Sequence, residues 1–225
     1  MPSPPFRALD AAALERLYGA PARPSLAKVA DRLTPAYRLW LERAPFVAIA
    51  SSGSRPSTLA DEHGAFDERA TDTGAADCSP RGDAPGRLLS VLDERTIAIP
   101  DRRGNRRTDT LRNLVANPAI GLLFLIPGVQ ELLRVNGRAI VTDDAGLLGR
   151  LELDGARPTT AIVVSVEAVY FQCARALMRS ALWDPASCAT PGEVPSAGEM
   201  IRSVDAGFDA RGYDAALRAR QRKTL

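Results

Sequence analysis

The pattern of hydrophobic positions changes character near residue 44. Before that point, apolar residues recur at helical spacing over residues 11–18 and 25–43, and within the second region Pro35 fits the first turn of a new helix capped by Thr34. Asp10 is a suitable N-cap for the first of these helices, and Gly19 ends it. The pattern therefore predicts a helical segment at the N-terminus, residues 1–43, followed by a body of a different kind.

From residue 44 to residue 185, short apolar runs bounded by turn residues predict strands. The predicted strands are Phe46–Ala50, Leu88–Leu92, Thr96–Pro100, Ala119–Ile126, Gln130–Thr142 and Ala161–Cys173. The run from Ala119 is almost entirely apolar, which predicts a central strand with both faces covered. Five or six strands in hairpin-like order predict an antiparallel barrel, and a fold that is mainly β with peripheral helices (α+β).

Helices and loops are predicted between and after these strands. One helix runs from Asp109 to Asn117, and another, capped by Asp143, ends at Leu151. Residues 54–77 show no apolar period, so we expect a mobile surface loop inserted into the barrel. Within residues 186–225, the sequence predicts a loop over residues 186–198, followed by a basic helix from about Asp209 to Arg222, which is a solvated appendage or part of a dimer surface.

Composition narrows the class of protein. Hydrophobic residues make up 45% and charged residues 25% of the 225 residues, as in an ordinary globular protein. The formal net charge of only +2 argues against nucleic acid as a partner. No apolar run approaches the roughly 18 residues of a membrane span, and the first residues lack the features of a secretory signal. We therefore expect a cytoplasmic protein.

Metal binding and side-chain catalysis are not predicted. The three cysteines are irregularly spaced, and the single histidine, His63, falls in the predicted loop. The chain contains neither GxGxxG nor GxxxxGK[ST], and no serine or cysteine belongs to a recognisable nucleophile–base motif. If the protein is an enzyme, we expect a cofactor to carry the chemistry.

A basic turn offers the strongest sign of a ligand. Residues 102–107 contain four arginines, between a predicted strand and the helix that begins at Asp109. Unpaired N–H groups at a helix start favour anions, and arginine can contact phosphate through two N–H groups at once. The turn is therefore a candidate phosphate site, although a solvated basic turn would have the same sequence.

Several motifs in succession resemble a known family. They are Asp77–Asp83, Ile99–Arg107, Asn113–Pro118, Leu122–Gly128, Leu133–Ala139 and Arg179–Pro185. Their order and spacing resemble the pyridoxamine 5'-phosphate oxidase-like, FMN-binding split-barrel family. The resemblance covers roughly residues 33–185. It implies an antiparallel split β-barrel and a homodimer that holds two FMN molecules in clefts between the subunits.

The resemblance also implies which residues bind the cofactor. They are Arg81, Ile99, Pro100, Asp101, Arg102, Arg103, Asn105, Arg106, Arg107, Arg179 and Trp183. Arg81 would reach the flavin phosphate or ribityl chain. The basic turn would hold the phosphate, and the backbone of residues 99–101 would lie along the isoalloxazine ring. Arg179 and Trp183 would approach from the partner subunit.

Residue chemistry leaves other roles open for two of these side chains. Arg81 is also placed to form an ion pair with Asp83. Trp183 could present a flat face to a ring or close the end of the barrel core. The residues that bind the substrate phosphate in true pyridoxamine phosphate oxidases have no match after Pro185, so vitamin B6 activity is not expected.

The functional prediction is an FMN-dependent oxidoreductase that transfers hydride through flavin N5 to or from an unknown small substrate. A second hypothesis is a non-catalytic flavin carrier or redox sensor. A third keeps the barrel and replaces FMN with a deazaflavin. Haem ranks lower, because the chain offers few axial ligands.

Overall fold

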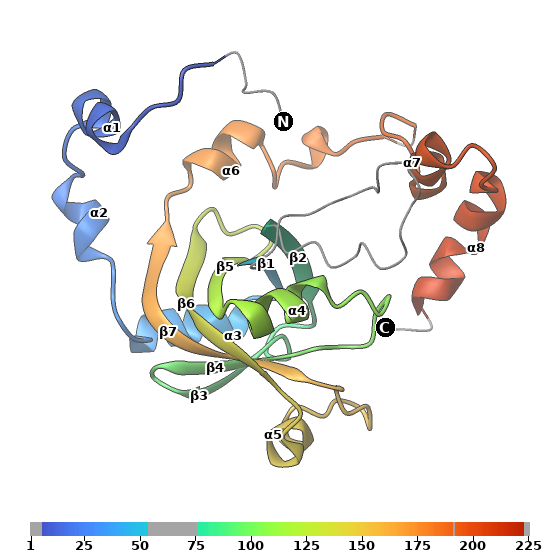
Figure 1. Ribbon diagram of the computed structural model, residues 1–225, viewed down its shortest axis with the longest axis horizontal. Coiled ribbons are helices and arrows are strands. Elements are labelled where there is room, and N and C mark those ends of the chain that lie inside the picture. Colours follow the sequence, from blue (N-terminus) through green and yellow to red (C-terminus); the bar gives the residue numbers. More distant parts are fainter. Residues whose placement is uncertain (1–5, 54–75, 191, 223–225) are drawn as a thin grey trace.

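The computed structural model describes residues 6–53, 76–190 and 192–222 (Figure 1). Three helices come first: α1 (Ala11–Tyr18), α2 (Arg23–Ala27) and α3 (Pro35–Arg43). The barrel strands are β1 (Phe46–Ser52), β2 (Ala76–Gly82), β3 (Ser90–Asp93), β4 (Thr96–Pro100), β5 (Ala119–Leu125), β6 (Leu132–Thr142) and β7 (Ala161–Gln172). The remaining elements are α4 (Asp109–Ala116), α5 (Ala145–Arg150), α6 (Arg175–Ser180), the 3-10 helix η1 (Pro185–Ser187), α7 (Ala197–Val204) and α8 (Ala210–Arg222).

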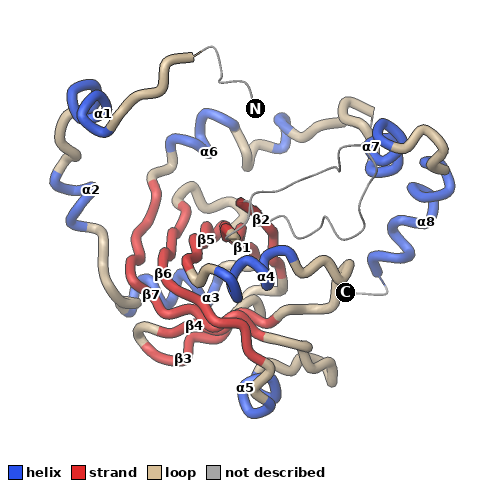
Figure 2. Tube along the Cα trace, in the orientation of Figure 1, coloured by secondary structure: helices blue, strands red, loops and turns tan. Residues whose placement is uncertain are grey.

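Seven strands form one sheet in the order β2-β1-β5-β6-β7-β4-β3, and all pairs in it are antiparallel. The sheet is strongly curved, and its two longest strands, β6 and β7, run side by side from below α6 toward α5 (Figure 2). The two ends of the sheet are not joined by a strand ladder within the described residues. The predicted α+β fold with an antiparallel split barrel is confirmed, with seven strands in place of five or six.

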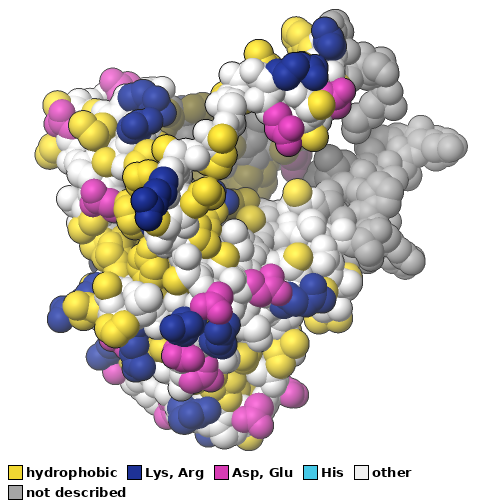
Figure 3. Space-filling model, turned by 90° about the vertical axis from the view of Figure 1, so that its left-hand side faces the viewer, with side chains coloured by type: hydrophobic (Ala, Val, Ile, Leu, Met, Phe, Trp, Pro, Cys, Tyr) yellow, Lys and Arg dark blue, Asp and Glu magenta, His cyan; other side chains and the backbone are white. Residues whose placement is uncertain are grey.

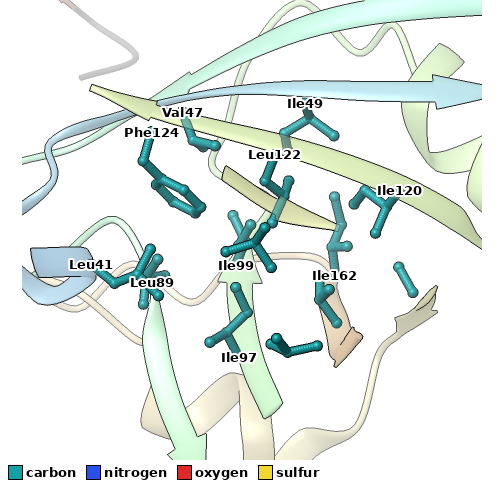
Figure 4. Packing of buried hydrophobic residues seen from close by; sticks show 14 of the residues in the cluster. Leu41, Val47, Ile49, Leu89, Ile97, Ile99, Ile120, Leu122, Phe124 and Ile162 are labelled. Atoms are coloured by element: carbon teal, nitrogen blue, oxygen red, sulfur yellow. The ribbon is translucent and has the colours of Figure 1, made fainter. Parts of the chain in front are cut away.

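The core lies inside this curved sheet. Alternate residues of β1 and β5 point inward, so that Val47, Ile49, Leu122 and Phe124 are almost completely buried. Figure 4 shows these side chains meeting those of β4 and β7. The outward face of β5 is half-buried, so the prediction that both its faces are covered was too strong.

Strand β2 was missed because its residues lack an apolar pattern. Exposed and half-buried side chains alternate along it, and none is buried. It pairs only with β1, and Pro80 is tolerated because β2 is an edge strand. The last two residues of the predicted 54–77 loop therefore belong to β2. The rest of that loop, including His63, lies outside the described residues.

Some helices differ from the predictions. Within the predicted stretch 25–43, the new helix at Pro35 capped by Thr34 is confirmed as α3, whereas the first part is only the short α2, and Ala30 between them forms an isolated bridge with Val169. The cap of α5 is Asp144, whose carboxylate accepts from the N–H of Leu147 at 2.7 Å, one residue beyond the predicted Asp143. Helices α6 and α7 were not predicted, because each is too short to show a period.

The register of β6 against β7 shifts at Gly137. A Cβ at this position would collide with the carbonyl oxygen of Ser165 on the neighbouring strand. A side chain therefore cannot be accommodated at this position of the β6–β7 pair, and glycine permits the bulge that bends the two strands.

Helices α7 and α8 form a hairpin fixed by one carboxylate. Asp214 accepts hydrogen bonds from the Ser196 hydroxyl at 2.6 Å and from the Gly198 N–H at 2.8 Å. Ser196 and Glu199 also form a reciprocal capping box at the start of α7. The hydrogen bond from Ser196, followed by that from Gly198, holds the pKa of Asp214 below its ordinary value of 3.8.

We predict that acid loosens this hairpin through Asp214. A carboxylate with a lowered pKa contributes stability above pH 3.8, and this contribution is lost as the pH falls through the lower, folded-state pKa. Asp214→Asn should loosen the hairpin at neutral pH and remove most of this acid sensitivity, as measured by hydrogen exchange of the Gly198 amide. Asp205→Asn is the control. Equal acid sensitivity in wild type and Asp214→Asn would contradict the assignment.

No helix among the described residues is long and apolar enough to cross a membrane.

Candidate functional site

A pocket of about 1130 Å³ opens between three segments of the chain, residues 77–82, 101–111 and 156–160. The first segment belongs to β2, the second leads from β4 into α4, and the third precedes β7. Seven of the predicted cofactor-binding residues line this pocket: Arg81, Asp101, Arg102, Arg103, Asn105, Arg106 and Arg107. The structure therefore brings Arg81 and the basic turn onto one cavity, which we call the arginine pocket.

Strand β2 places Arg81 on its half-buried side, together with Ser79. The guanidinium donates to the Ser79 hydroxyl at 2.7 Å, to the Pro80 carbonyl at 2.9 Å and to Asp101 at 3.3 Å. Only 20% of the Arg81 side chain is exposed. Arg81 is thus held at the pocket wall by Asp101, which follows β4, and the ion pair with Asp83 that its sequence allowed is not the one formed.

Asp83 pairs instead with Arg102, and this contact is structural. Arg102 Nε lies 3.1 Å from the Asp83 carboxylate, and Nη1 donates to the Leu151 carbonyl at 2.9 Å. Nη2 reaches the Arg87 carbonyl at 3.4 Å. The guanidinium therefore ties together the end of β4, the loop after β2 and the end of α5, which leaves it little capacity for a ligand.

The turn from residue 103 to 107 divides into paired and unpaired arginines. Arg107 forms an ion pair with Asp109 at 2.7 Å, and its N–H donates to the Asn105 side chain at 3.0 Å. Arg103 and Arg106 are exposed and make no hydrogen bond or ion pair with another described residue. Arg106 also has a left-handed backbone, with φ of 64°, which is uncommon outside glycine.

The N-terminus of α4 faces the same pocket. Its cap residue, Thr108, makes no side-chain bond to the first turn, since its hydroxyl accepts from Arg112 Nε at 3.1 Å. Residues 108–111 line the cavity. Backbone N–H groups of this turn are therefore available to a ligand, and the helix dipole favours a negative charge there.

A row of polar contacts attaches α4 to β1 and β2. The Thr110 hydroxyl donates to Asp77 at 2.6 Å, the Asn113 amide to the Ser51 hydroxyl at 3.2 Å, and the Asn117 amide to the Ser52 hydroxyl at 3.1 Å. Thr110 and Asn113 are 3% and 5% exposed. We call these three pairs the polar seam. It fixes the helix by directed bonds, beside the apolar contact of Leu114 with the core.

The third wall of the pocket, residues 156–160, was missed by sequence reasoning. It carries Arg157, whose Nε lies 3.8 Å from the Glu152 carboxylate. It also carries Thr160, whose hydroxyl is buried and has no hydrogen-bond partner among the described residues. The carbonyl of Thr160 accepts from the Asp101 N–H at 2.9 Å. This short stretch has no motif of its own, and only the fold places it beside the arginines.

The other predicted site residues lie away from the pocket lining. Ile99 and Pro100 are buried in β4, directly before Asp101. Arg179 is exposed at the end of α6. Trp183 is half-buried, and its indole N–H donates to the Val129 carbonyl at 2.8 Å. Within one chain, therefore, neither Arg179 nor Trp183 reaches the arginine pocket.

Comparison with protein families supplies the deciding observation. The model of the family described as pyridoxamine 5'-phosphate oxidase matches residues 33–173, which is more than half of the chain. The chain belongs to the pyridoxamine 5'-phosphate oxidase family. The matched span contains the whole seven-stranded sheet and every segment of the pocket.

The solved structures that resemble this chain are distant in sequence. A putative pyridoxamine 5'-phosphate oxidase from Lactobacillus delbrueckii is 15% identical, with a TM-score of 0.42 over 63% of this chain and 95% of its own. HupZ from Group A Streptococcus is 13% identical, with a TM-score of 0.41 over 57% of this chain and 86% of its own. The FAD binding protein from Mycobacterium smegmatis is 12% identical, with a TM-score of 0.37 over 64% and 97%.

No curated protein matches the chain. At these identities and scores, the structural resemblances add no argument about activity. What this member of the family does must be inferred from the site itself.

Proposed function

We propose that this member of the pyridoxamine 5'-phosphate oxidase family binds FMN in the arginine pocket and acts as an oxidoreductase on a small substrate. One observation carries the proposal. Arg103 and Arg106 have no partner among the described residues, and they stand on a pocket that also receives the uncapped N-terminus of α4. Cationic side chains and helix N–H groups together suit a phosphate group.

The charge of the pocket supports a dianionic ligand. Six arginines and three aspartates line it, and each aspartate is already engaged. Asp101 pairs with Arg81, Asp109 with Arg107, and Asp77 accepts from Thr110. The unpaired cations are thus concentrated at the turn before α4, where the terminal phosphate of FMN would be held. The buried Thr160 hydroxyl adds an unused polar group to the opposite wall.

Bound FMN would supply reversible two-electron chemistry. The chain would bind and orient it: Arg103, Arg106 and Asn105 at the phosphate, Arg81 at the ribityl chain, and the backbone of Ile99, Pro100 and Asp101 beside the ring. Arg81 is held in place by Ser79 and Asp101, which suits a residue that must present a fixed donor.

We propose that the functional unit is a homodimer. Exposed hydrophobic side chains occur on α2 (Leu26), just after it (Val29) and at the end of β7 (Phe171). These elements lie on the face that Figure 3 shows, where hydrophobic side chains gather between charged ones. Burial of such a face between two chains would be favourable. A second chain is also the source from which Arg179 and Trp183 would reach the pocket.

A non-catalytic flavin carrier or redox sensor is the second candidate. It is favoured by the engagement of all three lining aspartates, because the described pocket then offers no free carboxylate as a general acid or base. Turnover with a reductant and an acceptor would favour the enzyme, and tight flavin without turnover would favour the carrier. A deazaflavin would use the same phosphate site.

The first test is the visible absorption spectrum of the purified protein, recorded before and after addition of FMN and desalting. Retained flavin bands support the proposal. A colourless protein that retains neither FMN nor a deazaflavin would contradict it. Size measurement of the same sample by light scattering tests the homodimer.

A further inference from the structure

The polar seam attaches α4 to β1 and β2, and one of its three pairs also lies at the pocket. We propose that Asp77 and Thr110 are positioning residues for the phosphate site, because their hydrogen bond sets the direction of the first turn of α4. This inference rests on the proposed binding of a flavin phosphate at that turn.

The first turn of α4 has little else to fix it. Its cap residue, Thr108, forms no capping bond to the turn. The buried apolar residue of the helix is Leu114, one turn further on, whereas Leu111 is only partly buried. The ion pair between Arg107 and Asp109 connects the first turn of α4 only to the loop directly before it. Beside the partial packing of Leu111 against the core, the bond from Thr110 to Asp77 is therefore the directed contact that ties this turn to the sheet.

The geometry of this bond suits a fixing role. The two oxygens are 2.6 Å apart, and Thr110 is 3% exposed, so water does not compete freely for the hydroxyl. A hydrogen bond to a carboxylate is stronger than one between neutral groups. Threonine also has few side-chain rotamers, because its Cβ is branched.

Asp77 connects two walls of the pocket. It lies on the same side of β2 as Ser79 and Arg81, since side chains alternate along a strand. Its carboxylate therefore links the wall that carries Arg81 to the helix that presents its N–H groups. Without the bond, α4 would keep its contacts at Asn113, Leu114 and Asn117, but its first turn would be free to pivot about them. The N–H groups would then no longer converge with Arg103 and Arg106 on one phosphate.

The seam itself supplies a matched control. The Ser52–Asn117 bond also attaches α4 to the sheet, but it lies at the end of the helix away from the pocket, and in it the Asn117 amide donates to the Ser52 hydroxyl. Thr110→Val removes the hydroxyl with little change in shape, Thr110→Ser keeps it, and Ser52→Ala removes the distant acceptor. Each variant is measured as full-length protein for FMN affinity by fluorescence titration and for melting temperature.

Thr110→Val should weaken FMN binding about tenfold, the effect of losing one well-placed contact. Thr110→Ser and Ser52→Ala should bind within about twofold of wild type. Thr110→Val and Ser52→Ala should both lower the melting temperature by about 2–4 °C, so that stability and affinity are separated. Asp77→Ala should reproduce the loss of affinity and replaces Thr110→Val if that variant does not fold.

Two results would overturn the inference. One is wild-type affinity in Thr110→Val. The other is an equal loss of affinity in Ser52→Ala, which would mean that the seam acts only through general stability. Both are distinct from failure of the proposed function, in which wild-type protein itself does not bind FMN.

Discussion

Replacement of both Arg103 and Arg106 by alanine should lower FMN affinity by at least about a hundredfold. Each guanidinium is unpaired within the described chain, so its removal leaves no buried carboxylate behind and costs little stability. A hydrogen bond to a charged group contributes about 1.5–3 kcal/mol, and two such losses correspond to a factor of a hundred or more. Riboflavin, which lacks the phosphate, should bind both proteins weakly and equally.

Fluorescence titration of FMN and riboflavin measures this difference. The matched control is the double variant Arg202→Ala with Arg211→Ala, which removes two exposed arginines that do not line the pocket. The control should bind FMN like wild type. Wild-type affinity in the Arg103 and Arg106 double variant would show that the phosphate lies elsewhere, and the solvated-turn interpretation of this motif would then stand.

Arg102→Ala should act mainly on stability, in contrast to the Arg103 and Arg106 double variant, which should act mainly on FMN affinity. The ion pair of Arg102 with Asp83 has side chains that are only 27% and 16% exposed, and two backbone carbonyls also accept from this guanidinium. Removal of one partner from a buried ion pair costs about 3–5 kcal/mol. Since this pair is partly solvated, we expect the free energy of unfolding to fall by about 2–3 kcal/mol.

Urea denaturation measures this loss. Arg87→Ala serves as the control, because Arg87 pairs with Asp154 at 3.2 Å through side chains that are 48% and 80% exposed. Surface pairs of this kind contribute at most about 1 kcal/mol. If Arg102→Ala were as stable as Arg87→Ala, the structural role of Arg102 would be wrong. Its part in the predicted cofactor set would then need to be tested in the same way as that of Arg103.

Strands with a strong apolar pattern could be read from the sequence. β5, β6 and β7 lie within a few residues of their predicted bounds, because their side chains build the core. β2 could not be found in this way. It is an edge strand without a buried side chain, and its existence depends on hydrogen bonding to β1. Strand pairing is a property of the folded chain and leaves little trace in one segment.

The candidate site was predictable in its motifs but not in its pairings. The basic turn was identified from its residues and Arg81 through the family resemblance, and the fold brings them to one pocket. Which carboxylate each arginine contacts depends on the tertiary structure. Arg81 contacts Asp101, which is 20 residues away in sequence, and not the nearby Asp83. The segment 156–160 lines the pocket because the barrel fold places the start of β7 there, so no local sequence signal could have revealed it.

The two ends of the curved sheet are not joined by a strand ladder among the described residues, and this has a consequence for stability. β2 ends the sheet on one side and β4 lies next to the opposite end, and among the described residues the Arg81–Asp101 ion pair bridges β2 and the end of β4. A ligand bound across the pocket would contact both segments and cross-link them without a covalent bond. A ligand that binds only the folded chain raises its stability by about 2.7 kcal/mol at a hundredfold excess over Kd. Thermal shift therefore reports occupancy even for a colourless ligand, and a panel of phosphorylated compounds can be ranked by melting temperature alone.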